Sequence, residues 1–245
     1  PLETLYGGSK GGSSKGRTRD GLLQLYDILE AAKDHYHRFL LEDPSAQGAR
    51  EYLQRRGIER ASWEKFELGA SSAEWDGYLR AAGKCGISPE LLEKAGLVRR
   101  REQGGGFYDA FRGRLMFPIR DAQSRVIGFG ARTLGDDVPK YINTPKTALF
   151  DKSSVLYALP QARAGIQREG RICIVEGYTD AILAHQAGLD FFVASLGTAF
   201  TQENSKRLSR MAPRVLLIFD GDAAGQKATE RSLDLLVAEN LDVRI

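Results

Sequence analysis

After Gly170, short apolar runs alternate with stretches of helical spacing, and this alternation limits the possible folds more than any other feature of the chain. The apolar runs have the length of buried strands, and each intervening stretch is long enough for a helix. Strands connected in this way lie parallel, with helices packed on the sheet. The predicted strands are Ile172–Val175, Phe192–Ala194, Val215–Phe219 and a fourth that opens at Val243, and the predicted helices cover 179–187, 201–210 and 223–239.

The residues before this region follow a different pattern, in which helices come first and a β-hairpin follows. Helices are predicted over Leu22–Leu41 and near 46–56, 72–83, 88–95 and 153–164, strands over Leu115–Ile119 and Val126–Ala131, and turns over 139–145. The chain is therefore expected to be α/β overall, with a Gly/Ser-rich flexible linker over 1–20, a basic α+β subdomain over 21–168 and a parallel-sheet subdomain over 169–245. Because Pro1 is not an initiator residue, we expect the chain to be part of a longer protein.

Composition narrows the class of protein. The longest purely apolar run, Val215–Phe219, is far shorter than the ~20 residues of a membrane helix, so no membrane segment is expected. Two cysteines, Cys85 and Cys173, cannot form a disulfide framework or a four-ligand zinc site, which favours a cytoplasmic protein. The net charge is only +3, yet residues 94–152 hold 12 basic and 6 acidic residues. A basic surface of this kind suits a polyanionic partner, although a solvated basic face remains an alternative.

Two acidic clusters directly follow predicted strands. Glu176-Gly177-Tyr178-Thr179-Asp180 comes after Val175, and Asp220-Gly221-Asp222 comes after Phe219. Loops at the carboxyl ends of parallel strands form the ligand crevice of such sheets, so Glu176, Asp220 and Asp222 are expected to share one space. Carboxylates held this close repel one another unless a cation lies between them, and oxygen ligands favour Mg²⁺ or Mn²⁺. The alternative is that these acidic residues only cap the helices that follow.

The same residues and several others resemble a known family. The two acidic clusters, about forty residues apart, resemble the Toprim domain, which is shared by DNA primases, topoisomerases and some nucleases. The resemblance is collinear over about 22–245 and extends to stretches found in bacterial, DnaG-type DNA primases. These stretches are Arg112–Asp121, Val126–Arg132, Pro139–Thr147, Leu149–Leu159 and Ala194–Thr198.

The resemblance implies a primase catalytic core that makes short RNA primers on single-stranded DNA from nucleoside triphosphates, with an RNA–DNA hybrid as product. It implies two divalent ions, Mg²⁺ or Mn²⁺, held by Glu176, Asp220 and Asp222 with Asp180 supporting them. It also implies that basic and polar residues line the nucleotide and template cleft, namely Arg112, Arg114, Arg132, Lys140, Asn143 and Lys152. The family's third acidic cluster, its zinc domain and its helicase-binding domain are expected outside these residues, so no zinc is expected within them. Contacts with the replicative helicase and single-strand-binding protein of the primosome are expected through those other parts.

Two other functions are compatible with parts of the pattern. A strand that ends in Asp220-Gly221-Asp222 also opens the phosphotransferases that use an aspartyl nucleophile, but Glu176 then has no role. A non-catalytic module that binds single-stranded DNA would use the basic residues alone. Among the aromatic residues, we expect Trp63, Phe66 and Trp75 to pack in the core rather than to stack on bases.

Overall fold

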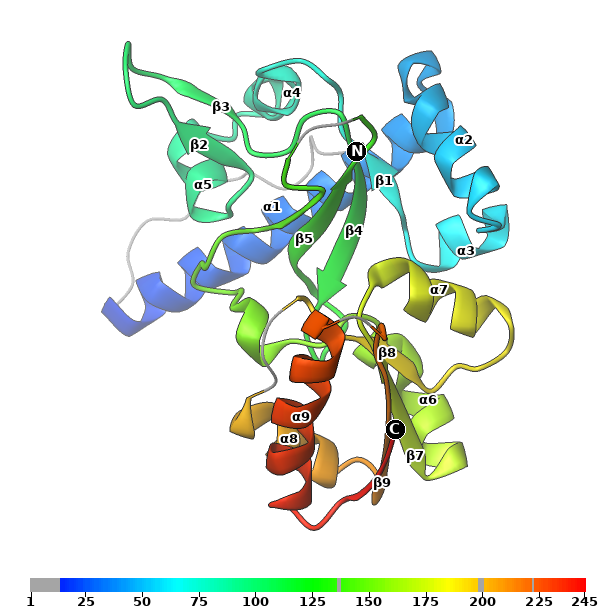
Figure 1. Cartoon of the computed structure of the whole chain (residues 1–245). Coiled ribbons are helices and arrows are strands. Elements are labelled where there is room, and N and C mark those ends of the chain that lie inside the picture. The colour runs from blue at the N-terminus through cyan, green and yellow to red at the C-terminus, as the bar shows by residue number, and fades with distance from the viewer. Residues whose placement is uncertain (1–13, 136–137, 198–200, 222) are drawn as a thin grey trace. The chain divides into compact units, whose positions relative to one another are not determined.

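The chain forms two compact units in a computed structural model that describes residues 14–135, 138–197, 201–221 and 223–245, and only the backbone of 14–19, 223 and 224 (Figure 1). Unit 1 comprises the described residues up to 56 together with 63–118 and 125–150. Unit 2 comprises 57–62, 119–124 and the described residues from 151 onward. The last change from unit 1 to unit 2 falls at 150/151, and the subdomain boundary at 168/169 stays a prediction from the sequence. Of the described helices, none combines the length and the apolar character needed to cross a lipid bilayer.

The first 150 residues hold a long helix, several short ones and a small antiparallel sheet. The helices are α1 (Ser14–Glu42), η2 (Pro44–Ala46), α2 (Gln47–Arg55), α3 (Arg60–Lys65), α4 (Gly77–Lys84) and α5 (Pro89–Lys94). The strands are β1 (Gly69–Ala70), β2 (Val98–Arg100), β3 (Phe107–Asp109), β4 (Arg114–Arg120), β5 (Val126–Thr133) and β6 (Tyr141–Asn143). The main sheet has the order β1-β4-β5-β6, and β2 pairs with β3 as a separate hairpin.

Helix α1 covers the main sheet with the apolar face that its spacing predicts. Leu25, Ile28, Leu29 and Ala32 are buried in the same core as the sheet residues. The ring of Tyr36 lies edge-on to that of Phe129 in β5, with 5.5 Å between the ring centroids. The helix begins at Ser14, inside the segment expected to be a linker, and the remainder of that segment lies outside the described residues.

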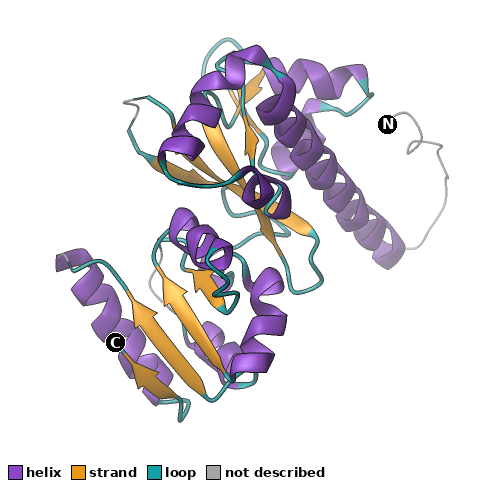
Figure 2. Cartoon of the chain, turned by 90° about the vertical axis from the view of Figure 1, so that its right-hand side faces the viewer, coloured by secondary structure: helices purple, strands orange, loops and turns teal. Residues whose placement is uncertain are grey.

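Residues 151–245 form the predicted parallel sheet with its helices (Figure 2). The strands β7 (Arg171–Val175), β8 (Phe192–Ala194), β9 (Arg214–Ile218) and β10 (Asp242–Arg244) lie in the order β10-β9-β7-β8 and are all parallel. The helical elements are η3 (Lys152–Ser154), α6 (Leu159–Glu169), α7 (Tyr178–Gln186), α8 (Gln202–Ser209) and α9 (Ala223–Val237). The strand–helix alternation read from the sequence is therefore confirmed.

The order of these strands creates a switch point. After β7 the chain moves to one side of it to form β8, and then crosses to the other side to form β9. Connections that leave in opposite directions from neighbouring strands open a crevice at the carboxyl ends of those strands. The core beneath holds Ile166 of α6, Leu208 of α8 and Leu236 of α9 against Val215 and Leu217 of β9.

One local prediction was wrong in its bounds. The helix expected over 153–164 is replaced by the short η3 and by α6, which begins only at Leu159, directly after Ala158 in a left-handed conformation with φ of 63°. The segment 139–145, expected to be rich in turns, also contains strand β6. That strand is held by pairing with β5, a long-range contact that local residue preferences do not report.

The contact between α1 and β1 generates a stability prediction. A methyl group on Gly69 would lie 2.6 Å from Tyr36 Cβ and 2.7 Å from the Tyr36 carbonyl carbon, and the helix backbone cannot move aside. We expect Gly69→Ala to lower the free energy of unfolding by about 1–3 kcal/mol, the usual cost of overpacking. The control is Gly83→Ala in α4, where nothing lies within 4 Å and a helical alanine is neutral or stabilising. Urea midpoints that are equal for Gly69→Ala and the unmodified chain would contradict the prediction.

Candidate metal site and nucleic-acid interface

Glu176 and Asp220 meet at the switch point of the parallel sheet. Val175 of β7 is paired with Ile218 of β9, so the loops that follow the two strands leave the sheet side by side. The backbone amide of Asp220 donates a hydrogen bond of 3.0 Å to Glu176 Oε1. The structure thus brings two of the predicted acidic residues together, with the Glu176 carboxylate against the Asp220 backbone.

Gly225, in the first turn of α9, makes room for this arrangement. A methyl group there would lie 2.8 Å from Glu176 Oε1 and would overlap the carbonyl of Asp220. Only a residue without a side chain allows the Glu176 carboxylate to lie against the start of the helix. The glycine is therefore part of the site, although it carries no functional group.

Asp180 holds the shape of the first acidic loop. It is the third residue of α7, and its Oδ2 accepts a hydrogen bond of 3.1 Å from the backbone amide of Gly177. A carboxylate at this position satisfies an amide that the helix leaves unpaired and interacts favourably with the helix dipole. Asp180 therefore orients the segment that carries Glu176, and one of its oxygens serves this purpose.

The described carboxylates fit a hard divalent cation in their chemistry. Glu176 and Asp220 offer oxygen ligands from neighbouring loops, which is the donor type that Mg²⁺ and Mn²⁺ prefer. Asp222, the third predicted ligand, lies outside the described residues. Within the residues that the structure describes, no group of three or more acidic, histidine or cysteine side chains is close enough to hold an ion.

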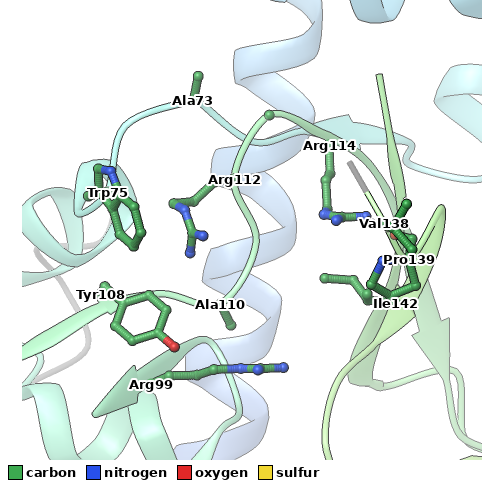
Figure 3. A pocket seen from close by; sticks show the side chains of 11 residues that line it. Ala73, Trp75, Arg99, Tyr108, Ala110, Arg112, Arg114, Val138, Pro139 and Ile142 are labelled. Atoms are coloured by element: carbon green, nitrogen blue, oxygen red, sulfur yellow. Dashed lines mark hydrogen bonds between the residues drawn. The ribbon is translucent and has the colours of Figure 1, made fainter. Parts of the chain in front are cut away.

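Unit 1 contains a cavity of about 550 Å³ that combines aromatic rings with arginines (Figure 3). Its lining includes the rings of Trp75 and Tyr108 and the side chains of Arg99, Arg112 and Arg114. Rings and guanidinium groups together suit a ligand with both flat bases and phosphates.

Trp75 and Arg112 lie against each other in the lining of this cavity. The Arg112 guanidinium carbon lies 4.2 Å from the centre of the Trp75 ring and 5.3 Å from that of Tyr108. Arg112 Nη1 also donates a hydrogen bond of 2.7 Å to the carbonyl of Asp109. Trp75 was expected in the core, and this was wrong, because 57 % of its surface is exposed.

Arg114 is more buried than Arg112, and its side chain stabilises the backbone of another segment. It is only 8 % exposed, and its Nη1 donates a hydrogen bond of 3.2 Å to the carbonyl of Pro139. This bond fixes the segment that leads to Lys140, whose side chain is exposed to solvent. Arg114 thus connects the cavity to the segment that carries Lys140, another predicted residue.

A second basic group surrounds the ring of Tyr52 in α2. The guanidinium carbon of Arg132 lies 3.9 Å from the ring centre, and those of Arg56 and Arg55 lie 5.6 and 5.9 Å from it. Arg132 is also paired with Tyr141 in the register of β5 and β6, and Asn143 lies opposite Gly130 in the same ladder. Arg55 and Arg56 were not predicted, because nothing in the linear sequence connects α2 with the β5–β6 hairpin.

Lys152 is the one member of the predicted basic set that lies in unit 2. It is exposed at the start of η3, and the neighbouring Asp151 caps that turn by accepting a hydrogen bond of 3.0 Å from the Ser153 amide. The other five predicted basic and polar residues belong to unit 1.

Asp109 positions the aromatic part of the cavity. Its backbone amide donates a bond of 2.8 Å to the carbonyl of Trp75, and its carboxylate accepts bonds of 2.7 and 2.9 Å from the amides of Tyr78 and Leu79 at the start of α4. The side chain is nearly inaccessible, with only 2 % exposed. Burial raises the pKa of Asp109 from 3.8 to about 6, although the two amide hydrogen bonds oppose that shift.

Comparison with known proteins gives consistent matches along the chain. The family model described as "DNA primase catalytic core, N-terminal domain" matches residues 35–163, and a Toprim domain model matches 170–245. A DNA primase of Halalkalibacterium halodurans is 39 % identical over 221 residues, which are 90 % of this chain and 37 % of that protein. A DNA primase of Deinococcus radiodurans is 44 % identical over 221 residues, with 90 % and 38 % covered. The chain thus spans well under half the length of these relatives.

Solved structures give the same result. A crystal structure of a DNA primase domain from Pseudomonas aeruginosa superposes with a TM-score of 0.82 at 42 % identity, covering 86 % of this chain and 66 % of that one. A structure of the DnaG primase catalytic domain bound to single-stranded DNA superposes with a TM-score of 0.80 at 37 % identity, covering 89 % and 67 %. The predicted α/β fold class, with its parallel-sheet second part, is confirmed.

The buried carboxyl of Asp109 predicts a measurable pH dependence. Its folded pKa of about 6 lies above the unfolded value of 3.8, so the folded state binds more protons between these values and its stability falls as the pH rises through 6. We expect the unmodified chain to lose as much as about 3 kcal/mol relative to Asp109→Asn between pH 4 and pH 7.

The measurement is urea unfolding of both chains across that pH range. Asparagine offers one acceptor oxygen for two amides, so a constant destabilisation is expected in addition, but only the carboxyl group titrates. Asp27→Asn, which makes the same substitution at an exposed position of α1, is the matched control. If Asp109→Asn runs parallel to the unmodified chain at every pH, the assignment is wrong.

Proposed function

This chain belongs to the family of DNA primase catalytic cores, and we propose that it carries the polymerising part of a primase. In this proposal it joins ribonucleotides from nucleoside triphosphates into short primers along a single-stranded DNA template, and an RNA–DNA hybrid is the product. The observation that carries the proposal is the hydrogen bond from the Asp220 backbone amide to the Glu176 carboxylate, which joins two acidic loops at the switch point of a parallel sheet. Carboxylates placed in this way are what nucleotidyl transfer requires near the reacting phosphate.

Glu176, Asp220 and Asp222 would hold the divalent ions, either Mg²⁺ or Mn²⁺. Two such ions, when bound, stabilise the charge that develops on the attacking and leaving oxygens. Other residues of the chain support these ligands. Asp180 orients the loop that carries Glu176, and Gly225 allows the carboxylate to lie against α9.

The template would use the cavity of unit 1. Trp75 offers a flat exposed face on which a base can stack, and Arg112 lies over the same ring, where it can reach a phosphate. Arg114, Arg132, Lys140, Asn143 and Lys152 are proposed to complete the nucleotide and template contacts. Base pairing selects the nucleotide, so the protein needs no contacts that distinguish one base from another.

Partners and location follow from the proposed activity. A primase works at the replication fork in the cytoplasm, with the replicative helicase and single-strand-binding protein as partners. We assign those contacts to parts of the relatives that lie outside these 245 residues. The aspartyl phosphotransferase alternative is less well supported, because it gives Glu176 no role although this residue accepts a hydrogen bond from the Asp220 loop.

Removing one carboxylate tests the metal assignment. In the full-length protein we expect Asp220→Asn or Glu176→Gln to reduce primer synthesis and Mn²⁺ affinity by about 100-fold or more. Replacing a residue that only hydrogen-bonds to a metal ligand already lowers metal affinity or activity by ~10–100-fold. Binding of single-stranded DNA should change less than about twofold, because the basic residues proposed to neutralise the DNA phosphates are not altered. Asp234→Asn, an exposed carboxylate further along α9, is the matched control. Primer synthesis that persists in Asp220→Asn would refute the assignment.

Removing the exposed ring tests the template assignment. We expect Trp75→Ala to weaken binding of a thymidine oligonucleotide by about 1–3 kcal/mol, the usual worth of one stacked base, and Trp75→Phe to retain most of the affinity. The dependence of affinity on salt should not change, because no phosphate contact is lost. Leu189→Ala removes an exposed apolar side chain from unit 2 and should have no effect. Fluorescence anisotropy measures all four proteins, and unchanged affinity in Trp75→Ala would exclude a stacking role.

A further inference from the structure

Unit 2 contains a second arginine-lined cavity that neither the metal site nor the template cavity uses. It has a volume of about 490 Å³, and it is lined by residues of α6, by residues at the carboxyl end of α8 and by Ala122. Its floor is aliphatic, formed by Leu159, Ile166 and Met211. Its rim carries three guanidinium groups, those of Arg163, Arg207 and Arg210.

The positive charge of this rim is not neutralised locally. No carboxylate lines the cavity, and no salt bridge joins any of the three arginines to an acidic side chain among the residues the structure describes. Arg163 Nη2 donates a hydrogen bond of 2.9 Å to the carbonyl of Ala122, which orients its guanidinium without cancelling its charge. Three uncompensated cations beside one cavity repel each other, and an anionic ligand would relieve this repulsion.

Helix capping explains only part of this arrangement. Arg207 and Arg210 lie at the carboxyl end of α8, where basic residues interact favourably with the helix dipole. Arg163 lies in the middle of α6 and has no such role, yet it faces the same cavity from the opposite helix. The shared cavity is therefore the feature that all three arginines have in common.

The aliphatic floor identifies the kind of ligand. The template cavity of unit 1 presents Trp75 and Tyr108 for stacking, whereas this cavity has no aromatic ring in its lining. A floor of leucine, isoleucine and methionine suits an aliphatic or aromatic side chain from a partner, and methionine adapts to different shapes. Arginine forms paired hydrogen bonds with carboxylates, which an acidic peptide supplies on both sides of such an anchor.

We propose that this cavity of unit 2 docks an acidic segment of a partner protein, with an apolar side chain of that segment on the Leu159–Ile166–Met211 floor and its carboxylates on Arg163, Arg207 and Arg210. The proposal goes beyond primer synthesis, because none of these residues belongs to the metal site or to the template cavity.

The test uses the full-length protein and a short fluorescent peptide of aspartates and glutamates around a central Leu-Phe pair. We expect Arg207→Glu to weaken peptide binding by about tenfold or more, the worth of one charge-assisted hydrogen bond. Arg163→Glu, on the other helix, should have the same effect and serves if the first variant is unstable. Lys206→Glu makes the same charge change at an exposed neighbouring position that does not line the cavity, so it should change affinity less than about twofold.

Three results would overturn the proposal. The first is equal loss of affinity in Lys206→Glu and Arg207→Glu, which would mean that the peptide responds only to overall charge. The second is equal affinity for a peptide whose Leu-Phe pair is replaced by serines, since the floor would then be unused. The third is a comparable loss of thymidine-oligonucleotide binding in Arg207→Glu, which would assign the cavity to nucleic acid. Primer synthesis by the variants should be unchanged, so failure here is distinguishable from failure of the proposed activity.

Discussion

The hydrogen bond from the Asp220 amide to Glu176 Oε1 is the contact on which the candidate metal site depends. It joins the loops after β7 and β9, which are separated in the sequence by α7, β8, α8 and β9. The bond forms because the two strands are neighbours in the sheet, and the carboxylate can reach it because position 225 has no side chain. The topology of the sheet therefore places the two acidic loops side by side, with the Glu176 carboxylate held against the Asp220 backbone.

Asp109 has a comparable role in unit 1, but it acts through burial rather than through topology. Its carboxylate ties the start of α4 to β3, and its backbone amide holds the carbonyl of Trp75. The exposed ring of Trp75 is held by this fixed backbone and by its contacts with Arg112 and Tyr108. The raised pKa of Asp109 is the electrostatic cost of this arrangement, since the buried carboxylate is charged at neutral pH.

The sequence was sufficient to predict features that depend on local pattern. The alternation of strands and helices after Gly170, the position of α1 and the hairpin of β4 and β5 all follow from periodic spacing and polar turns, and the structure has them. The convergence of Glu176 and Asp220 was predictable as well, because parallel strands place their carboxyl ends at one edge. Asp222 and the roles of Asp180 and the basic residues stay predictions.

Features that depend on distant partners were not predictable. Trp75, Tyr108 and Arg99 come from three separate segments, and no spacing rule connects them before the chain folds. Tryptophan is usually buried, so expecting Trp75 in the core was reasonable from residue type and wrong in this fold. Strand β6 has only three residues and exists because β5 offers it hydrogen bonds. Each of these features is decided by a contact between segments rather than by the preference of one segment.

Three arginines of unit 1 have guanidinium groups that are held in fixed orientations. Arg112, Arg114 and Arg132 each donate a hydrogen bond to a backbone carbonyl, those of Asp109, Pro139 and Thr133. A carbonyl orients the guanidinium plane but leaves its positive charge in place, whereas a carboxylate would neutralise it. Side chains already held in one orientation lose less conformational entropy when a ligand binds. The excess of basic residues over 94–152 therefore includes guanidinium groups held in one orientation, which a freely solvated basic face would lack.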